Sequence, residues 1–189
     1  MHPESRKEEI IHTAARLFKE KGYSAVTMRD LASAMGIKAA SLYNHIQSKQ
    51  DILKSIIISI AEEFTEGMKI IQQTDASCIE KLKNIVTLHV DISSRNINGM
   101  ASLNNDWMHL EDQLEYYLKL RQDYEDDFRN ILNSGINENE IIAEKPDVML
   151  FSMLSTLRSL YLWIPKKEDL DPEELAASLS RVLINGINM

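Results

Sequence analysis

Hydrophobic residues recur along the chain at the spacing of amphipathic helices, and no stretch alternates as a half-buried strand would. The first apolar stripe comprises Ile10, Ile11, Ala14, Ala15, Leu17 and Phe18. Gly22 follows this stripe as a C-terminal stop signal. The chain also lacks an internal repeat. The pattern predicts an all-α protein.

Two short helices and one long helix are predicted next. Thr27, followed by Asp30 three positions later, resembles a capping box, and Gly36 ends the short helix that it opens. A third short helix fits residues 39–46. Ser48 then gives the start signal for a long helix, whose apolar positions are Ile52, Leu53, Ile56, Ile57, Ile60, Ala61, Phe64 and Met68.

The rest of the chain continues in the same manner. Pro146 suits the first turn of a helix, and Asp171-Pro172 combines a cap residue with proline at the first helical position. We therefore expect a helix from Ser77, a break at 96–99, a short segment at 103–108, a helix at 111–133 closed by Gly135, a loop at 134–144, a helix at 146–163, and a last helix from 171 to 185 with Gly186 past its end.

Length and composition restrict the class of protein. A chain of 189 residues makes one domain of ordinary size, or a small domain joined to a medium one, and its core needs no disulfide or metal. The single Cys78 excludes an internal disulfide and fits a reducing compartment. The strongest apolar run, Ile56 to Ile60, already contains Ser59 and is far shorter than a membrane span, and no signal peptide is recognisable at the N-terminus. These features predict a cytoplasmic protein without a membrane partner.

Charge is distributed unevenly. The formal net charge is −8, yet residues 1–54 hold nine Lys/Arg against six Asp/Glu, and the remainder holds twelve against 23. A mildly basic N-terminal part on an acidic body favours contact with a polyanion through the N-terminal part alone. A local excess of this size also arises by chance, so charge by itself does not decide the function.

Residues 27–49 carry the most informative motif. Two short helices meet at Gly36-Ile37-Lys38, which is the spacing of a helix-turn-helix. The second helix is thin on its outer side, and major-groove entry requires this because base edges are read by the first part of such a helix. We expect Lys38, Ala39, Ser41 and Asn44 to face the groove, Tyr43 and His45 to reach phosphates, and Thr27 and Lys49 to meet phosphate at helix N-termini.

Residues 6–54 resemble the TetR-type transcriptional regulators. The resemblance rests on Ala14, Phe18, Gly22-Tyr23, Thr27-Met28-Arg29-Asp30-Leu31-Ala32, Gly36-Ile37, Leu42-Tyr43-Asn44-His45 and Ser48-Lys49. It implies a three-helix DNA-binding head, residues 1–47, joined through a long fourth helix to a helical ligand-binding and dimerising body, residues 48–189. Two positions depart from the family pattern. Lys38 stands where Ser or Thr usually caps the recognition helix, and Ile46 stands where Phe is usual.

The body resembles the family's effector domains. In particular, residues 124–141 and the two helices after them are similar to regulators of fatty-acyl or related acyl-CoA ligands. Aromatic and Met residues of the body are candidates for an apolar effector pocket: Trp107, Met108, Tyr117, Met153 and Trp163, with Tyr116 and Met149 beside them. Arg158 could anchor an anionic ligand or pair with an acidic residue across a dimer interface.

One head has too few contacts for strong operator binding. Two heads spaced by their bodies could engage major grooves about 34–36 Å apart on a near-palindromic site. The helices at 146–163 and 171–186 are expected to form the interface of a homodimer, and their apolar residues are Met149, Leu150, Met153, Leu154, Leu157, Leu160, Leu175, Leu179 and Leu183. The resulting hypothesis is a DNA-binding regulator, most simply a repressor, released from its operator by a small apolar or acyl-type effector.

Other functional classes have weaker support. His109, Glu111 and Asp112 have metal-ligand residue types, but neighbours at this spacing on a helix do not converge on one ion, and no cofactor motif is present. Cys78 could sense redox state, although burial as a small hydrophobe fits better. The alternatives are an enzyme with a helical catalytic body, which no catalytic motif supports, and a helix-turn-helix module that binds protein. The effector, the operator, and repression as opposed to activation stay open at this point.

Overall fold

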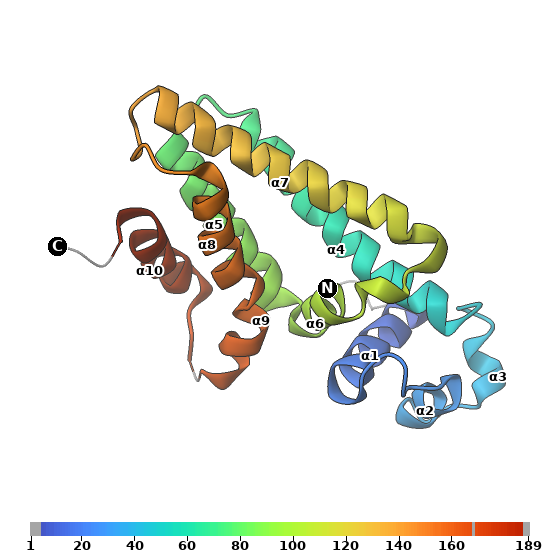
Figure 1. Cartoon of the computed structure of the whole chain (residues 1–189). Helices are drawn as coiled ribbons and strands as arrows, with labels where there is room; N and C mark the ends of the chain where they lie inside the picture. Colours follow the sequence, from blue (N-terminus) through green and yellow to red (C-terminus); the bar gives the residue numbers. More distant parts are fainter. Residues whose placement is uncertain (1–4, 168, 187–189) are drawn as a thin grey trace. The chain divides into compact units, whose positions relative to one another are not determined.

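The computed structural model describes residues 5–167 and 169–186. Their regular secondary structure is entirely helical and contains no strand, as the hydrophobic pattern predicts (Figure 1). The all-α fold class is therefore confirmed. The α-helices are α1 (Arg6–Lys21), α2 (Met28–Ala34), α3 (Ala39–Leu42), α4 (Lys49–Gln72), α5 (Cys78–Arg95), α6 (Ile97–Asn105), α7 (Leu114–Asn137), α8 (Pro146–Arg158), α9 (Leu160–Trp163) and α10 (Pro172–Asn185). Three single turns of 3₁₀-helix complete the described part: η1 (Trp107–His109), η2 (Glu111–Gln113) and η3 (Ile164–Lys166).

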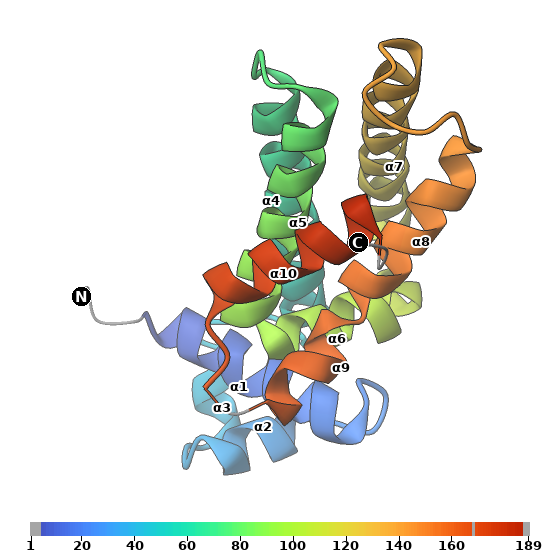
Figure 2. The same ribbon diagram turned by 90° about the vertical axis from the view of Figure 1, so that its left-hand side faces the viewer.

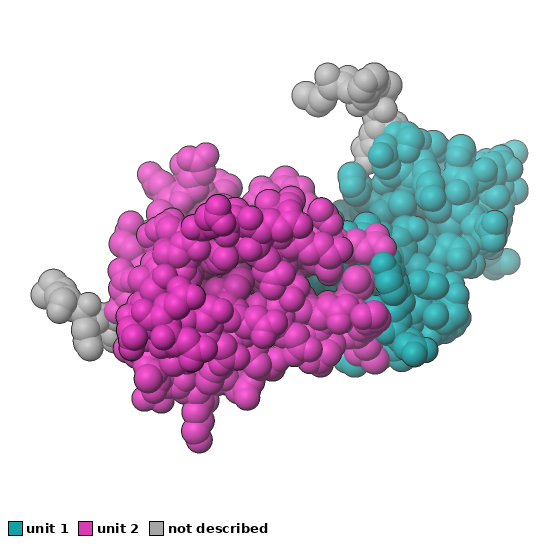
Figure 3. Space-filling view, turned by 90° about the horizontal axis from the view of Figure 1, so that it is seen from above, with its two compact units in different colours: residues 1–61, 96–117 teal, residues 62–95, 118–189 magenta. Residues whose placement is uncertain are grey.

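The chain divides into two packed units (Figure 3). Unit 1 consists of residues 1–61 and 96–117, and unit 2 of residues 62–95 and 118–189. Unit 1 therefore adds the first half of α4, all of α6 and the 3₁₀ turns η1 and η2 to the three N-terminal helices. The packing of the helices does not divide the chain after residue 47. The domain boundary expected there stays a prediction.

Unit 1 is built on the apolar face of α1. Ile10, Ala14 and Phe18 are buried, and α1 packs against α6 and α2. A capping box at Ser5 opens α1, and Gly22 ends it with φ 81°, a left-handed value that glycine adopts without strain. The stop signal recognised in the sequence is thus the one that operates, whereas the capping box at Ser5 comes from the structure.

The long helix α4 follows the predicted stripe. All eight apolar residues named for it, from Ile52 to Met68, are buried. The backbone N–H of Asp51 donates to Ser48 Oγ at 3.0 Å, which confirms Ser48 as the start signal. The apolar face of α4 is thus buried both in the part that belongs to unit 1 and in the part that belongs to unit 2, where tertiary packing adds to the helix's own hydrogen bonds.

Unit 2 is organised around α5. This helix packs against α8, α9 and α10, and Figure 2 shows α10 lying across α5. Asp171 caps α10 by accepting a hydrogen bond from Glu173 N at 2.9 Å, with Pro172 at the first helical position. Gly186 follows the helix with φ 77°. Both ends of this last helix agree with the sequence signals.

Two glycines were assigned a wrong role from sequence. Gly99 lies inside α6, which Asn96 caps by accepting from Gly99 N, so the break is confined to the cap residue. Gly135 lies inside α7, which runs on to Asn137. A Cβ added to Gly135 would meet Cys78 Sγ at 2.3 Å, and one added to Gly99 would meet Ile60 Cδ1 at 2.7 Å. Both glycines allow a neighbouring helix to pack closely. From a single sequence, a glycine in this role cannot be distinguished from one that ends a helix.

Two predicted helices are shorter than expected. The segment 146–163 is interrupted at Ser159, where α8 ends and the four-residue α9 begins. The third helix ends at Leu42 instead of residue 46, and residues 43–45 continue as a turn. Short interruptions of this kind are set by packing and leave no strong mark on an apolar pattern.

One stretch of the described residues, Pro146–Lys166, is long and apolar enough by composition to cross a membrane, with a mean hydropathy of 1.3 in its most apolar window. The expectation of no membrane-spanning stretch rested on the short run Ile56 to Ile60, and this longer stretch corrects it. Because 39% of that window is buried inside the structure, and core helices of globular proteins have the same composition, the stretch is weak evidence for a membrane span. The expectation about a signal peptide concerns in part residues 1–4, which lie outside the described residues.

Candidate DNA-binding and effector sites

The helix-turn-helix is held together by its apolar side. Gly36, with φ 66°, lies in the turn after α2, and Ile37 N donates to Ala32 O at 3.0 Å. Leu31 of α2 and Leu42 of α3 are buried, and the two helices pack on each other. The turn, its glycine and its small apolar contacts all lie where the motif places them.

The outer side of α3 and of the turn after it faces solvent. Tyr43 is 56% exposed, and Lys38, Ala40, Asn44 and His45 are also exposed, whereas Ala39 and Ser41 are half-buried. Leu42 and Ile46 point inward and anchor the segment. Lys38 caps α3 without a side-chain hydrogen bond, so the departure from Ser or Thr at this position costs the helix a cap. The side chains expected at DNA are thus accessible, and their contacts with DNA stay a prediction.

Thr27 has an internal role that limits its expected contact with phosphate. Its Oγ1 donates to Asp30 Oδ2 at 2.5 Å and accepts from Asp30 N at 3.2 Å. The hydrogen bonds from the side chain and backbone of Thr27 lower the pKa of Asp30 and keep this carboxylate charged at the start of α2. A negative charge already occupies the position where the helix would attract phosphate.

Lys49 is turned into the protein. Its ammonium Nζ donates to the carbonyl oxygens of Tyr23 and Val26, both at 2.8 Å, and lies 4.2 Å from the centre of the Tyr23 ring. Burial lowers the pKa of this ammonium. The side chain is therefore committed to the loop between α1 and α2. The phosphate contact expected at Lys49 stays a prediction, and its hydrogen bonds to this loop give the side chain a structural role as well.

The same loop is tied to the segment after α6. Tyr23 Oη donates to Gln50 Oε1 at 2.5 Å, and Gln50 Nε2 donates to His109 O at 2.5 Å. The rings of Tyr23 and His109 stack with their centres 5.2 Å apart. His109, considered above as a metal-ligand type, thus packs on Tyr23. The described residues contain no group of three or more His, Cys, Asp and Glu side chains that could hold a metal.

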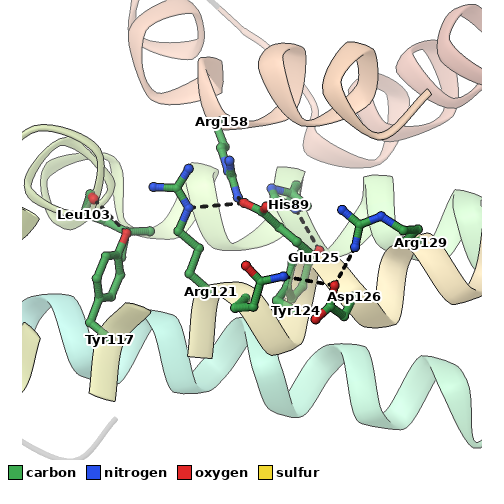
Figure 4. A network of polar contacts seen from close by, with 10 residues as sticks. His89, Leu103, Tyr117, Arg121, Tyr124, Glu125, Asp126, Arg129 and Arg158 are labelled. Atoms are coloured by element: carbon green, nitrogen blue, oxygen red, sulfur yellow. Dashed lines mark hydrogen bonds and ion pairs between the residues drawn. The ribbon is translucent and has the colours of Figure 1, made fainter. Parts of the chain in front are cut away.

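The candidate effector residues fall into both units. Trp107 and Tyr117 of unit 1 stack with ring centres 6.0 Å apart, and Tyr117 Oη donates to Leu103 O at 3.4 Å, as Figure 4 shows. Met108, by contrast, is 51% exposed. The stacking brings together two of the five residues.

The other two candidates belong to unit 2. Met153 is buried on α8, while Trp163 is 42% exposed and has Lys167 Nζ 5.1 Å from its ring centre. A groove between α5 and α10 is lined by eight residues, and none of the five candidates is among them. The lining residues are Lys83, Thr87, Glu173, Ala176, Ala177, Ser180, Arg181 and Asn185. The assignment of these residues to an effector pocket stays a prediction.

Sequence reasoning missed a buried polar cluster in unit 2. His89 of α5 is 3% exposed, and its Nε2 lies 2.9 Å from Tyr124 Oη of α7 (Figure 4). Phe64 of α4 packs on the His89 ring with centres 4.6 Å apart. Burial lowers the pKa of His89 to about 3, so the ring is neutral at physiological pH. The sequence showed His89 only as one more residue on an apolar stripe.

Arg158 has its partner within the chain. Its Nη2 donates to Glu125 Oε1 at 2.6 Å, and Arg121 Nε reaches the same oxygen at 3.2 Å (Figure 4). Burial opposes ionisation of Glu125, but the hydrogen bonds from Arg158 and Arg121 outweigh it and lower the pKa of Glu125. The sequence left open whether Arg158 anchors a ligand or pairs across a dimer interface. In the structure it instead forms an ion pair with Glu125 that joins α8 to α7 within the chain.

Cys78 is buried at the start of α5, and burial raises the pKa of its thiol to about 11. A thiol in this state is a poor nucleophile, which favours the expected role as a small hydrophobe.

Comparison with protein families decides the class. Residues 75–187 match the family described as "Tetracyclin repressor-like, C-terminal domain", and residues 10–56 match "Bacterial regulatory proteins, tetR family". The chain belongs to the TetR family. It is therefore a DNA-binding transcriptional regulator with a helix-turn-helix, and not an enzyme. The resemblance seen in residues 6–54 is confirmed.

Individual TetR relatives agree with this assignment. The transcriptional repressor KstR2 of Rhodococcus jostii (strain RHA1) is 24% identical over 151 residues, which are 79% of this chain and 74% of that protein. IcaR of Staphylococcus aureus (strain Newman), the negative transcriptional regulator of the biofilm operon icaADBC, is 32% identical over 94 residues, or 50% of this chain and 41% of that protein. The solved structure of the ketosteroid transcriptional regulator KstR2 of Mycobacterium tuberculosis has the same fold, with a TM-score of 0.90 at 20% identity over 100% of this chain and 97% of that one.

Proposed function

We propose that this TetR-family member is a repressor that binds a near-palindromic operator as a homodimer and is released by a small apolar or acyl-type effector. The observation that carries the proposal is the arrangement of α3 and its following turn. Leu42 and Ile46 are anchored in the core, while Lys38, Tyr43 and Asn44 project into solvent. A short, slim segment held rigidly and exposed on one side is what a major groove accepts.

The proposed contacts divide by chemistry. Lys38, Ala39, Ser41 and Asn44 are proposed to face the floor of the groove, where small side chains permit close approach and Asn44 offers an amide to a base edge. Tyr43 and His45 are proposed to donate to phosphate oxygens on either side. Thr27 and Lys49 contribute mainly by fixing the helix-turn-helix, and any phosphate contact there involves backbone N–H groups at the helix starts.

The homodimer is proposed to form through the last two long helices, α8 and α10. Most of the apolar residues first named for this interface, such as Leu150 and Leu157, are buried within the chain and form its own core. The exposed apolar residues of α8, α10 and the short α9 between them are instead Val148, Phe151, Leu162, Trp163 and Val182. Phe151 is 74% exposed, an unusual exposure for a large apolar side chain on a helix. These side chains supply the face that a second copy would cover.

The class of effector is supported by the apolar interior of unit 2 and by one relative. KstR2 is named a ketosteroid regulator, and a steroid ketone is a small, largely apolar molecule. Acyl-CoA thioesters share this character at their acyl end. Since an effector shifts an equilibrium only by its different affinity for two states, it must bind the DNA-free form more tightly than the operator-bound form. We place the regulator in the cytoplasm, where its operator lies, without a membrane partner.

Binding to the intergenic DNA upstream of the protein's own gene tests the proposal. Fluorescence polarisation should show specific binding that weakens steeply with salt, because each phosphate contact releases counterions. The double variant Tyr43→Ala/His45→Ala should bind about a hundredfold more weakly. Tyr116→Ala, which alters an exposed tyrosine outside the helix-turn-helix, should bind as the wild type does. Unchanged binding by the double variant, with its circular dichroism unaltered, would remove the assigned DNA-binding surface.

A further inference from the structure

Besides Ser94 Oγ, two buried polar atoms one helical turn apart on α5 have no hydrogen-bond partner among the described residues. They are Nδ1 of His89, which is 3% exposed, and Oγ of Ser93, which is 0% exposed. Residues four apart on a helix share one face, so the two atoms belong to the same side of α5. Buried polar groups in folded proteins nearly always have a partner, and two unpartnered groups on one helical turn require an explanation.

The surroundings of this turn are aromatic. Tyr124 of α7 occupies the other nitrogen of His89, with Oη 2.9 Å from Nε2. Phe64 of α4 packs against both, with ring centres 4.6 Å from His89 and 5.9 Å from Tyr124. Phe128, one turn after Tyr124 on α7, is fully buried. The polar turn is therefore enclosed by apolar surface from three helices, which suits a ligand that is apolar apart from one small polar group.

The proton on His89 can be assigned from its partner. The imidazole is neutral and carries one N–H. The hydroxyl of Tyr124 has Nε2 of His89 as its hydrogen-bond partner, and a phenol donates to an imidazole nitrogen more readily than it accepts from one. With Nε2 accepting, the hydrogen of the ring lies on Nδ1. Nδ1–H of His89 and Oγ–H of Ser93 are then two donors that seek an acceptor.

The charges around the cluster exclude an anion as that acceptor. Arg158 is the cation whose field acts on both His89 and Tyr124. Its guanidinium is already paired with Glu125 at 2.6 Å. A carboxylate placed beside His89 would be buried against a neutral ring and a neutralised arginine, and an uncompensated buried charge is strongly unfavourable. A carbonyl oxygen accepts two hydrogen bonds without bringing a charge.

We propose that Nδ1 of His89 and Oγ of Ser93 bind the neutral carbonyl oxygen of the effector, which is a ketone or a thioester on an apolar skeleton. The proposal rests on the effector-released function proposed above and specifies the chemistry of its ligand. Without effector, Ser93 Oγ–H can turn to the carbonyl of the preceding helical turn, but Nδ1–H of His89 has no such alternative. Of the two residues, His89 therefore depends more on the effector carbonyl for a hydrogen-bond partner.

Matched probes separate a carbonyl from other groups. Decanoyl-CoA is compared with S-decyl-CoA, in which a methylene replaces the thioester carbonyl, and 2-decanone is compared with decanoate. Calorimetry should show that at least one carbonyl probe binds about tenfold more tightly than its matched compound, which corresponds to a pair of hydrogen bonds to a neutral acceptor. Preference within the first pair indicates a thioester as the source, and preference within the second pair indicates a ketone.

Ser93→Ala tests the residues, with Ser94→Ala as the matched control. Ser94 is the next residue of α5 and also has a buried, unpartnered hydroxyl, but it lies on another face of the helix from His89. Ser93→Ala should reduce the preference for the carbonyl probe by about threefold or more, and Ser94→Ala should leave it unchanged. His89→Phe should abolish it. If His89→Phe does not fold, Ser93→Ala still decides, since it removes one oxygen without adding volume.

Three outcomes overturn the carbonyl site: no carbonyl probe binds, decanoate and S-decyl-CoA bind as well as their partners, or Ser94→Ala has the same effect as Ser93→Ala. These outcomes are separate from failure of the proposed function. If decanoate releases the operator without any preference for a carbonyl, the effector-released regulator stands and the carbonyl site does not. If the protein does not bind its operator, the proposed function fails whatever the probes do.

Discussion

The ammonium group of Lys49 donates a 2.8 Å hydrogen bond to the carbonyl oxygen of Tyr23 and lies 4.2 Å from the centre of the same residue's ring. A second hydrogen bond of 2.8 Å goes to Val26 O. One cation thus joins the start of α4 to the loop that precedes the helix-turn-helix. Without it, Val26 O loses its donor, and Tyr23 O keeps only the 3.3 Å hydrogen bond from Val26 N. We therefore expect Lys49 to help fix the orientation of the reading segment.

Replacing Lys49 by methionine keeps the aliphatic length and removes the donors. We expect Lys49→Met to lower the free energy of unfolding by about 1–2 kcal/mol, because hydrogen bonds from a charged donor are among the stronger ones. Operator binding should weaken while the dependence of log affinity on log salt keeps its slope. Thermal melting and polarisation titrations at several salt concentrations measure both effects.

Lys38→Met is the matched control for Lys49. Lys38 is exposed, and its side chain makes no capping hydrogen bond. This variant should keep its melting temperature and bind the operator more weakly, because Lys38 is proposed to face the groove. A loss of slope in Lys49→Met, with unchanged melting, would instead restore Lys49 as a direct phosphate ligand.

Gly135 allows α7 to pass closely over the start of α5. A methyl group at this position would lie 2.3 Å from Cys78 Sγ and 2.8 Å from Cys78 Cβ. We expect Gly135→Ala to destabilise the protein by about 1–3 kcal/mol, because the packed backbone must shift. Urea unfolding followed by circular dichroism gives the difference.

Cys78→Ala provides the test of mechanism for Gly135. In that background the closer of the two clashes disappears, while the contact with Cβ remains. Gly135→Ala should then cost less than it does in the wild type. Equal costs in both backgrounds would attribute the effect to the backbone of α7 instead of the contact with Cys78.

The buried His89 makes stability depend on pH. Its pKa is about 3 in the folded protein, against 6.5 as the ordinary value. Because the unfolded chain binds the proton more strongly, the stabilisation is complete above about pH 6.5 and declines as the pH falls toward the folded pKa. We expect a loss of about 2 kcal/mol in the free energy of unfolding between pH 6.5 and pH 5, a range in which most carboxylates stay ionised.

His89→Gln isolates this contribution, since glutamine can accept from Tyr124 but does not titrate. The difference in unfolding free energy between wild type and variant should shrink as the pH is lowered, if both are measured by urea unfolding. A constant difference across this range would mean that His89 is protonated equally in both states and that its ring is accessible to water.

Phe151 tests the dimer. It is 74% exposed on α8 beside Val148, which is 61% exposed. Phe151→Asp should give a monomer in sedimentation velocity and weaken operator binding by about a hundredfold or more, because the second head then no longer binds as part of the same molecule. Ile142→Asp, at an equally exposed residue outside the last two helices, should sediment as the wild type does. A dimer that survives Phe151→Asp would place the interface elsewhere.

Much of the fold was readable locally. Thr27 and Asp30, Gly22, Ser48, and the Asp171-Pro172 pair act where the sequence places them, because caps and stops depend on residues within one turn of each other. The apolar stripe of α4 likewise needs only a period of 3.6 residues to be recognised. The helix-turn-helix, and through it the family, follows from such local signals.

What the sequence by itself determined is therefore the helical class, most helix ends and the reading motif, all of which depend on near neighbours along the chain. The tertiary structure decided which glycine ends a helix and which, like Gly135, lets two helices touch. It also decided that Lys49 points inward, that Arg158 pairs with Glu125, and that His89 is enclosed by α4 and α7. These features join residues 23 to 57 positions apart, and no short-range pattern encodes such pairs, because burial and hydrogen bonding at a distance depend on how whole helices pack.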